Sequence, residues 1–146
     1  MNQILTDAQS LHDEIITNRR TIHQFAEIGF DLPQTYAYIF NKLTEYGYQP
    51  KKVGKMGITC LAGKPGRTIL LRADMNALPM AEESGESFAA VNGHCHSCGH
   101  DCHSAMLLGA AKLLKQRENE LHGTVKFMFQ PAEEIMGGAK DMLDNG

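Results

Sequence analysis

The sequence predicts an α/β fold, because segments with the apolar periodicity of helices alternate with short apolar segments typical of strands. Helical periodicity covers residues 7–27, 33–47 and 102–117. Strand-like segments cover residues 48–53, 58–62, 68–74 and 123–129. The chain has 146 residues, the length of one domain, and 42% of them are hydrophobic, which is enough for an ordinary core.

The two N-terminal helices are predicted from their ends and from their apolar spacing. The segment from Thr6 to Gln9 has the pattern of a capping box, and apolar residues then recur at helical spacing. This pattern predicts one amphipathic helix over residues 7–27. Pro33 suits the first position of a second helix, and Gly47 ends that helix.

The rest of the chain alternates between strands, one long loop and helices. Residues 68–74 are predicted to form a buried strand whose last residue is Asp74. Residues 76–100 show little periodicity, and a loop of that length in a compact domain usually has a function. A final short helix is predicted over residues 138–145. No strand follows this helix, so the sequence suggests an incomplete domain.

Composition and charge argue against several classes of partner. The formal net charge of −3 gives no reason to expect nucleic acid or an anionic membrane. No apolar run approaches the roughly 20 residues that a membrane-spanning helix needs. The N-terminus lacks the basic region and apolar core of a secretory signal, so we expect a cytoplasmic protein. In that reducing compartment, clustered cysteines are expected to be metal ligands or free thiols.

The most distinctive segment runs from His94 to His103 and contains four of the seven histidines and three of the four cysteines. Imidazole and thiolate side chains bind zinc, nickel, cobalt and copper, so this density suggests a transition-metal site. A structural zinc site built from Cys95, Cys98, Cys102 and a histidine is one alternative. Such sites usually join two separated pairs of ligands, however, and the chain has no second Cys-x-x-Cys pair.

For the outer members of this cluster the sequence favours structural roles. Cys95 and Cys102 are expected to be small buried thiols, and His94 and His103 to be surface imidazoles. Cys60, alone in a strand, is predicted to lie in the core.

Cys98 and His100 differ from these residues because they flank Gly99 just before a predicted helix. Glycine lets the backbone turn tightly, so both side chains can converge on one ion. Asp101 is placed either to cap the helix or to orient a metal ligand by a hydrogen bond.

An acidic pair, Glu133 and Glu134, follows directly on the last predicted strand. Adjacent carboxylates are most often solvated surface groups. At the carboxyl end of a strand, however, one of them can bind a metal while the other acts as a general base. Asp74 ends another strand and either reaches the same place or is a turn carboxylate, and spacing alone does not decide between the two.

Four motifs, in order along the chain, resemble those of the M20 metallopeptidase family. They span residues 19–30, 72–79, 96–101 and 123–134. The resemblance is closest to the amidohydrolase branch, which includes hippurate hydrolases, N-acyl-amino-acid amidohydrolases and auxin-conjugate hydrolases. It implies a mixed-sheet, metallo-aminopeptidase-like catalytic domain, of which residues 1–146 would be the N-terminal part. The dimerisation domain and the C-terminal part of the catalytic domain would be absent.

The resemblance also implies a chemistry. Cys98, His100 and Glu134 would bind divalent metal ions, two of them in the full-length enzyme, and Glu133 would be the general base. Three residues would support these ligands: Asp74, Asn76 and Asp101. The metal would be zinc, manganese, nickel or cobalt, and the substrate an N-acyl amino acid or a dipeptide-like molecule. The full-length enzyme would be a homodimer.

The sequence departs from the family pattern in three respects. Asn76 stands where the family usually has Asp, and an amide lacks the charge that raises the basicity of a ligand. Cys95 and Cys102 replace residues that are commonly Met and Gly. The third departure is that two further metal-binding histidines of the family come from downstream segments. Three histidines are not expected to replace them: His12, His23 and His122.

We therefore expect that the 146-residue chain does not turn over substrate by itself. Two other hypotheses stay open at this point. One is a non-catalytic fragment that binds a single metal ion. The other is a small zinc-binding or redox module, which would leave Asp74 and the acidic pair unexplained.

Overall fold

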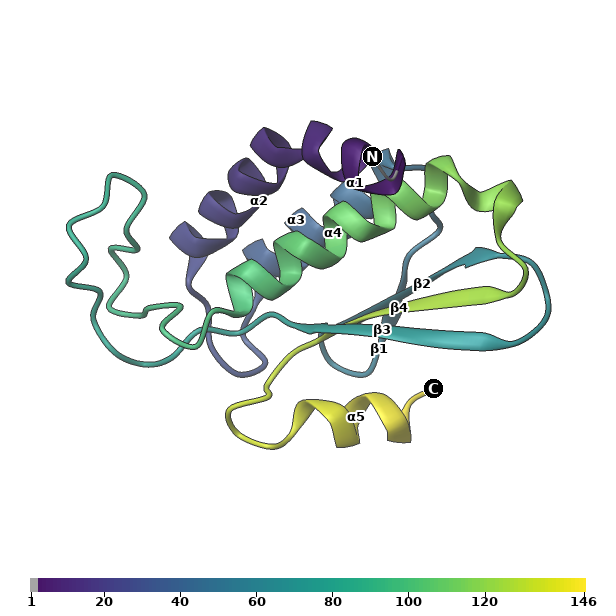
Figure 1. Cartoon of the computed structure of the whole chain (residues 1–146). Coiled ribbons are helices and arrows are strands. Elements are labelled where there is room, and N and C mark those ends of the chain that lie inside the picture. Colours follow the sequence, from purple (N-terminus) through teal and green to yellow (C-terminus); the bar gives the residue numbers. More distant parts are fainter. Residues whose placement is uncertain (1–2) are drawn as a thin grey trace.

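A four-stranded mixed sheet forms the centre of the computed structural model, which describes residues 3–146 (Figure 1). The strands, in the order β1-β2-β4-β3, are β1 Lys51–Val53, β2 Gly57–Gly63, β4 Thr124–Gln130 and β3 Thr68–Asp74. β2 is antiparallel to both β1 and β4, whereas β3 and β4 are parallel. The predicted α/β class and the mixed sheet implied by the resemblance are both confirmed.

β3 and β4 are joined through helix α4, His100–Gln116, because parallel neighbours need a crossover connection. Their register pairs Asp74 with Gln130, so both strands end at the same edge of the sheet. The segments that follow the two strands therefore start next to each other. In α/β folds this edge is where sites are built.

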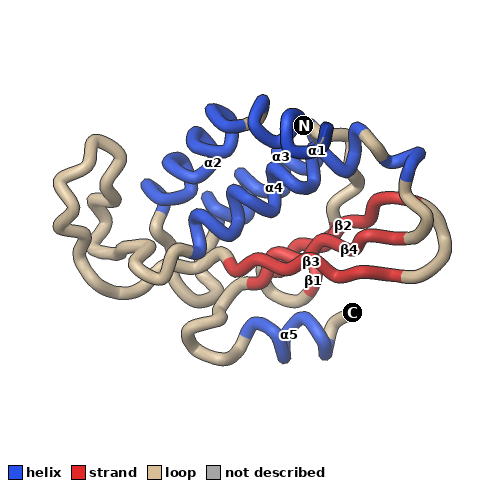
Figure 2. The backbone as a smooth tube through the Cα atoms, viewed as in Figure 1, coloured by secondary structure: helices blue, strands red, loops and turns tan. Residues whose placement is uncertain are grey.

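The helices cover the two faces of the sheet unequally. Besides α4, they are α1 Gln3–Ser10, α2 His12–Phe25, α3 Pro33–Glu45 and α5 Gly138–Asp144, and a short 3-10 helix, η1, covers Glu118–Glu120. In Figure 2, α1 to α4 lie above the red sheet and α5 lies below it. Within residues 3–146, no helix combines the length and the apolar character that crossing a membrane requires.

The single N-terminal helix predicted over residues 7–27 is wrong, because the chain forms two helices there. Thr6 lies inside α1 and does not cap a helix. The chain turns at the buried Leu11, whose amide donates to the Ala8 carbonyl (3.1 Å) and whose carbonyl accepts from the Ile15 amide (2.9 Å). Apolar spacing continues across this turn, so the sequence pattern does not reveal it.

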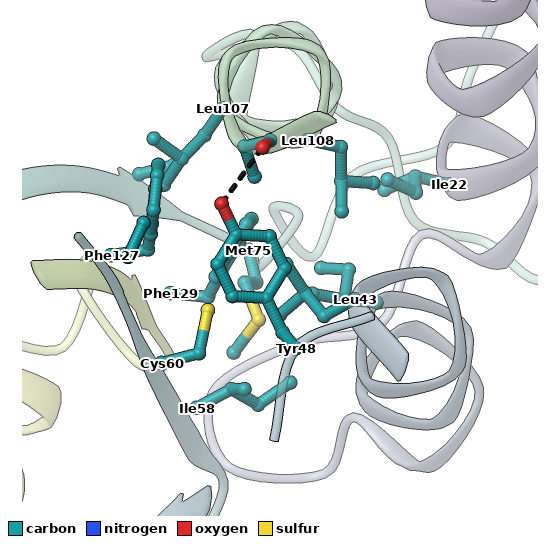
Figure 3. Close-up of a cluster of buried hydrophobic side chains, with 14 of the residues drawn as sticks. Ile22, Leu43, Tyr48, Ile58, Cys60, Met75, Leu107, Leu108, Phe127 and Phe129 are labelled. Carbon is teal, nitrogen blue, oxygen red and sulfur yellow. Dashed lines mark hydrogen bonds between the residues drawn. The ribbon is translucent and has the colours of Figure 1, made fainter. Parts of the chain in front are cut away.

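The main core lies between the sheet and helices α2, α3 and α4 (Figure 3). Phe127 and Phe129 of β4 are fully buried in it. Tyr48 packs edge-on against Phe127, with ring centroids 5.5 Å apart, and its hydroxyl donates to the Ala111 carbonyl of α4 (2.8 Å). Cys60 is buried as predicted, and burial raises the pKa of its thiol to about 12. These contacts hold α4 against the sheet.

Helix α2 packs closely on α4 because α4 carries a glycine at the contact. A Cβ atom on Gly109 would lie 2.9 Å from Cδ1 of Ile15, closer than real Cβ contacts come. The end of α2 consequently lies near the start of α4, where His23 reaches Asp101.

Replacing Phe127 by Ala is expected to lower the free energy of unfolding by about 3–5 kcal/mol, because a fully buried ring is removed from the core. Urea unfolding followed by circular dichroism measures this loss. Leu143→Ala, at an exposed position of α5, is the control and should change stability by less than about 0.5 kcal/mol. Equal losses in the two variants would contradict the central place of Phe127 in the core.

Candidate metal centre

The candidate site lies at the edge of the sheet where β3 and β4 end. β3 ends at Asp74, two residues before Asn76. After β4, Ala132 adopts a φ of 53° and turns the chain toward Glu133. The Glu133 amide then donates to Oδ1 of Asn76 (3.0 Å). The continuation of β3 thereby holds the backbone that follows β4.

His100 reaches this edge from the first turn of α4. Its Nδ1 atom lies 2.8 Å from the backbone carbonyl oxygen of Asn76. A carbonyl only accepts, so Nδ1 carries a proton and Nε2 is left free to bind a metal ion. Nε2 faces three carboxylates, at 3.6 Å from Asp74, 3.7 Å from Glu133 and 3.8 Å from Glu134.

Cys98 completes a group of three donor atoms. Gly99, between Cys98 and His100, is the N-cap residue of α4 and has a φ of 86°, which glycine adopts without steric cost. As expected from the sequence, the residues on either side converge. The donor atoms of Cys98, His100 and Glu134 all lie within 4.8 Å of one another. The hydrogen bond with Glu134 raises the pKa of the Cys98 thiol above its ordinary value.

This donor set fits a divalent transition-metal ion. Thiolate, imidazole and carboxylate are the three side-chain ligands that zinc and its neighbours take. The lone pair of His100 Nε2 and the carboxylate oxygens that it faces repel one another, because all of them are acceptors. A cation between them removes this repulsion. Three protein donors also leave a coordination position open, as a hydrolytic site needs.

A second group of donors overlaps the first. Asp74, His100 and His103 also bring donor atoms within 4.8 Å of one another. His103 is exposed, as predicted, but its Nδ1 lies 2.7 Å from Oδ1 of Asp74. The signal in the sequence was its position three residues after His100, on the same face of the helix. Because Nε2 of His100 has one lone pair, the two groups cannot each hold an ion through it.

Asp74 belongs to this site and is not an isolated turn carboxylate. Its side chain is buried, and its second oxygen pairs with Nη1 of Arg72 (2.7 Å). Burial raises the pKa of Asp74, but the hydrogen bond to His103 and the charge of Arg72 outweigh burial. The pKa of Asp74 therefore lies below its ordinary value, and the carboxylate stays ionised beside His100.

Of the two roles that the sequence allows for Asp101, capping of α4 is not the one that the structure shows. Gly99 is the N-cap residue, and no side chain caps this helix end. Asp101 is buried and its Oδ2 atom lies 2.7 Å from both Nδ1 of His23 and Nε of Arg19. Its side chain thus ties the start of α4 to α2 and does not face the backbone amides of its own helix.

The remaining cysteines of the cluster do not gather around an ion. Cys95 pairs with Leu78 through backbone hydrogen bonds and is half-buried. Cys102, expected to be a buried thiol, is exposed because it lies on the solvent side of the first turn of α4. In the part of the chain that the structure describes, neither belongs to a group of three metal donors. The geometry therefore does not support a structural zinc site built on three cysteines.

His96 is a buried imidazole to which the sequence assigned no role. It is 5% exposed, and neither ring nitrogen has a hydrogen-bond partner among the described residues. Burial and the charges of His23 and Arg19 together lower the pKa of His96 to about 4, against the opposing charge of Asp101. The ring is therefore neutral near neutral pH.

Comparisons with known proteins agree with this geometry. A family model described as peptidase family M20/M25/M40 matches residues 70–146. The N-acyl-L-amino acid amidohydrolase of Geobacillus stearothermophilus is 39% identical over 139 residues, which cover 91% of this chain and 37% of that protein.

Solved structures show the same relationship. A dinuclear metal-binding peptidase of the M20 family from Bacillus subtilis matches with a TM-score of 0.88 and 40% identity, over 93% of this chain and 39% of that one. A protein from methicillin-resistant Staphylococcus aureus matches with a TM-score of 0.94 and 39% identity, over 100% of this chain and 40% of that one.

The fold and the donor set thus define a mixed α/β domain with a candidate metal-binding site at one edge of its sheet. The chain belongs to peptidase family M20/M25/M40, and its relatives match the amidohydrolase branch that the sequence motifs indicated. It spans between 37% and 40% of the length of these three relatives.

In metal-free buffer, the stability of the chain is expected to fall as the pH is lowered from about 6.5 toward about 4. The pKa of folded His96, about 4, lies below its ordinary value of 6.5, so the unfolded chain binds this proton first. Neutral His96 contributes roughly 3 kcal/mol to the free energy of unfolding. This contribution is complete above the ordinary pKa of histidine and is lost as the pH falls toward the pKa of folded His96.

Urea titrations of a His96→Leu variant at several pH values measure this effect, and the variant should show a shallower dependence of stability on pH. The matched control is His122→Leu, because His122 is exposed. A His96→Leu variant with the same pH dependence as the parent would contradict the assignment.

Proposed function

We propose that residues 1–146 form the N-terminal part of the catalytic domain of a metal-dependent amidohydrolase, which cleaves the amide bond of N-acyl amino acids. The observation that carries this proposal is the convergence of Cys98, His100 and Glu134 at the ends of β3 and β4, with Glu133 beside them. The G. stearothermophilus N-acyl-L-amino acid amidohydrolase supports the substrate class. N-acetyl and N-benzoyl groups are the first acyl groups to test.

In this proposal Cys98, His100 and Glu134 are metal ligands. Zinc, manganese, nickel or cobalt suits them, and such ions polarise an amide carbonyl and make water acidic. The dinuclear site of the B. subtilis peptidase supports two ions in a full-length protein. We place the dimerisation domain and the C-terminal part of the catalytic domain outside residues 1–146, and propose a homodimer for the full-length enzyme. A cytoplasmic location and the lack of nucleic-acid or membrane partners stay predictions from the sequence.

Glu133 is the proposed general base. Its amide is held by Asn76, and its side chain, 40% exposed, lies 3.7 Å from Nε2 of His100. From this position the carboxylate can accept a proton from the attacking water and return it to the departing amine nitrogen. Glu134 hydrogen-bonds with Cys98 instead. The two adjacent carboxylates thus have different partners, as a base next to a ligand requires.

Asn76 supports both parts of the site without a charge. Its backbone carbonyl sets the tautomer of His100, and its Oδ1 atom accepts from the Glu133 amide. An aspartate would offer the same acceptor together with a negative charge near the metal ion. The amide keeps this acceptor, but its Nδ2 atom is buried without a hydrogen-bond partner among the described residues.

A second candidate function is metal binding without turnover, and the donor count on this chain favours it. Three protein donors meet the needs of one ion and not of two. The two candidates are compatible, because the first describes the full-length enzyme and the second describes these residues alone.

The 146-residue chain by itself is expected to release no amine from N-acetyl- or N-benzoyl-amino acids in the presence of Mn²⁺ or Zn²⁺, because its donors cannot hold two ions. Amine release is measured beside a Glu133→Gln variant, which excludes a contaminating hydrolase. Turnover that the variant loses would contradict this expectation and would show that association of chains completes the site.

A chimera, in which this chain replaces the matching segment of the G. stearothermophilus amidohydrolase, is expected to release amine from N-acetyl amino acids. Glu133→Gln in the chimera should lower kcat by about 10²–10⁴-fold, because the general base is lost. The control is Glu120→Gln, at an exposed carboxylate in η1. A folded and metal-loaded chimera without activity would contradict the proposed function, and an unchanged kcat in Glu133→Gln would contradict the role of Glu133.

A further inference from the structure

A cluster of charged side chains, three of them buried and Arg19 partly exposed, joins helix α2 to the segment that contains Cys98 and His100. The cluster consists of Arg19, His23, Glu82 and Asp101. Nδ1 of His23 and Nε of Arg19 each lie 2.7 Å from the same oxygen, Oδ2 of Asp101. Asp101 directly follows His100 and its side chain is 1% exposed. Two residues of α2 therefore contact the chain one position away from a proposed ligand.

The second ring nitrogen of His23 reaches the loop that precedes α4. Nε2 lies 2.9 and 3.0 Å from the two carboxylate oxygens of Glu82, which also accepts from the Ala90 amide (2.7 Å). Burial raises the pKa of Glu82, but its hydrogen bonds outweigh burial and lower the pKa to about 2. Ionised carboxylates only accept, so both ring nitrogens of His23 donate and the ring bridges two acidic side chains.

The charges of the cluster balance. Asp101 and Glu82 are negative, and Arg19 and the doubly protonated ring of His23 are positive. The side chains of His23, Glu82 and Asp101 are at most 5% exposed. Removing one member would leave a buried charge without its partner, which is costly enough to move the remaining groups.

Phe88 makes the main apolar contact of the loop over residues 77–99. Its ring lies edge-on to His23, with ring centroids 5.5 Å apart, and the guanidinium groups of Arg19 and Arg20 lie over it at 5.0 and 4.7 Å.

The buried apolar residues of the loop are Ala77 and Ala90, which pack with Ala26 at the end of α2. Met80 is half-exposed and Val91 is almost fully exposed. Alanine side chains bury little area, and in Figure 1 the loop extends beyond the edge of the sheet. The position of the loop therefore depends on the contacts that Phe88 and the polar groups of the loop make with α2.

These polar contacts converge on the end of α2. In addition to the charged cluster, three hydrogen bonds join the loop to the backbone carbonyls that follow the helix: Asn92 to Phe25 (2.8 Å), His94 to Ala26 (3.0 Å) and Ala77 to Glu27 (2.7 Å). Helix α2 is itself held on α4 by the close packing at Gly109. The helix thus provides a fixed reference for the loop.

We propose that Arg19 and His23 are positioning residues for the metal centre, which fix Asp101 and Glu82 and thereby place Cys98 and His100 for metal binding. The inference rests on the proposed function, because it takes these two residues as ligands. Neither Arg19 nor His23 is among the donors that converge on the site. Loss of a hydrogen bond to a metal ligand typically lowers metal affinity 10- to 100-fold, and we expect these contacts, one residue further out, to act at the lower end of that range.

Cobalt binding to the 146-residue chain tests this proposal without any measurement of activity. Co²⁺ bound to a thiolate gives a charge-transfer absorption that reports Cys98, and its visible d–d bands report the coordination geometry. His23→Gln is expected to weaken Co²⁺ binding about 10-fold or more and to alter the d–d bands. Arg19→Gln should act in the same direction, and Arg19→Lys, which keeps a positive charge near Asp101, should restore most of the affinity.

Two controls separate positioning from general destabilisation. His12→Gln changes an exposed histidine of the same helix and should leave affinity and spectrum unchanged. Phe127→Leu destabilises the core away from the cluster, and thermal unfolding in the presence of a chelator shows how its stability compares with that of His23→Gln. If Phe127→Leu lost the same affinity at equal stability, the effect would be global and the proposal would be overturned.

The possible outcomes are distinguishable. If the unaltered chain gave no thiolate–cobalt absorption, the proposed metal centre would fail and with it the proposed function. If it bound Co²⁺ and folded His23→Gln bound Co²⁺ equally with the same spectrum, only the positioning inference would fail. If His23→Gln did not fold, the Co²⁺ affinity of Glu82→Gln tests the positioning inference instead, because this variant alters the contact between His23 and Glu82 from the loop side. A tenfold loss in that variant supports the proposal, and an unchanged affinity overturns it.

Discussion

The parallel pairing of β3 with β4 is the constraint on which the candidate site depends. It pairs Asp74 with Gln130, so the strand that ends in a carboxylate and the strand that leads to the acidic pair finish at one edge. The crossover helix α4 has to start near this edge, because it follows the loop that leaves β3. A shift of the register by one residue would turn Asp74 away from His100. The core residues of β4 hold this register by their burial between the sheet and the helices.

Asn76 fixes the positions of two groups at this edge of the sheet, the His100 ring and the backbone of Glu133. Its backbone carbonyl keeps the proton of His100 on Nδ1. The free lone pair of His100 then faces the carboxylates, and Cys98 joins it across Gly99. Each donor is therefore held by a hydrogen bond, a strand end or a helix start, which restricts its movement before any ion arrives. Such restriction is what a hydrolytic metal centre needs in order to bind its ion in one geometry.

Helix α2 contributes no metal donor, but it contacts the segment that carries Cys98 and His100. The loop that carries Cys98 is held on α2 by hydrogen bonds, by paired charges and by the packing of Phe88 against His23 and Arg19. The N-terminal motif that resembles the amidohydrolase branch contains Arg19 and His23, and the structure shows a physical use for both. They contact the segment next to Cys98 and His100 without belonging to the group of candidate metal donors.

The sequence by itself determined the α/β class, most of the elements and the residues that gather in the candidate site, because periodicity, turn residues and the motif around Cys98 and His100 are local patterns. The tertiary structure decided the rest. Only packing shows that the N-terminal helix breaks at Leu11, that His103 contacts Asp74, and that Asp101 faces α2 and does not cap α4. These features depend on which distant segment a side chain meets. Spacing along one segment limits where its side chains can point, but the partner comes from the fold.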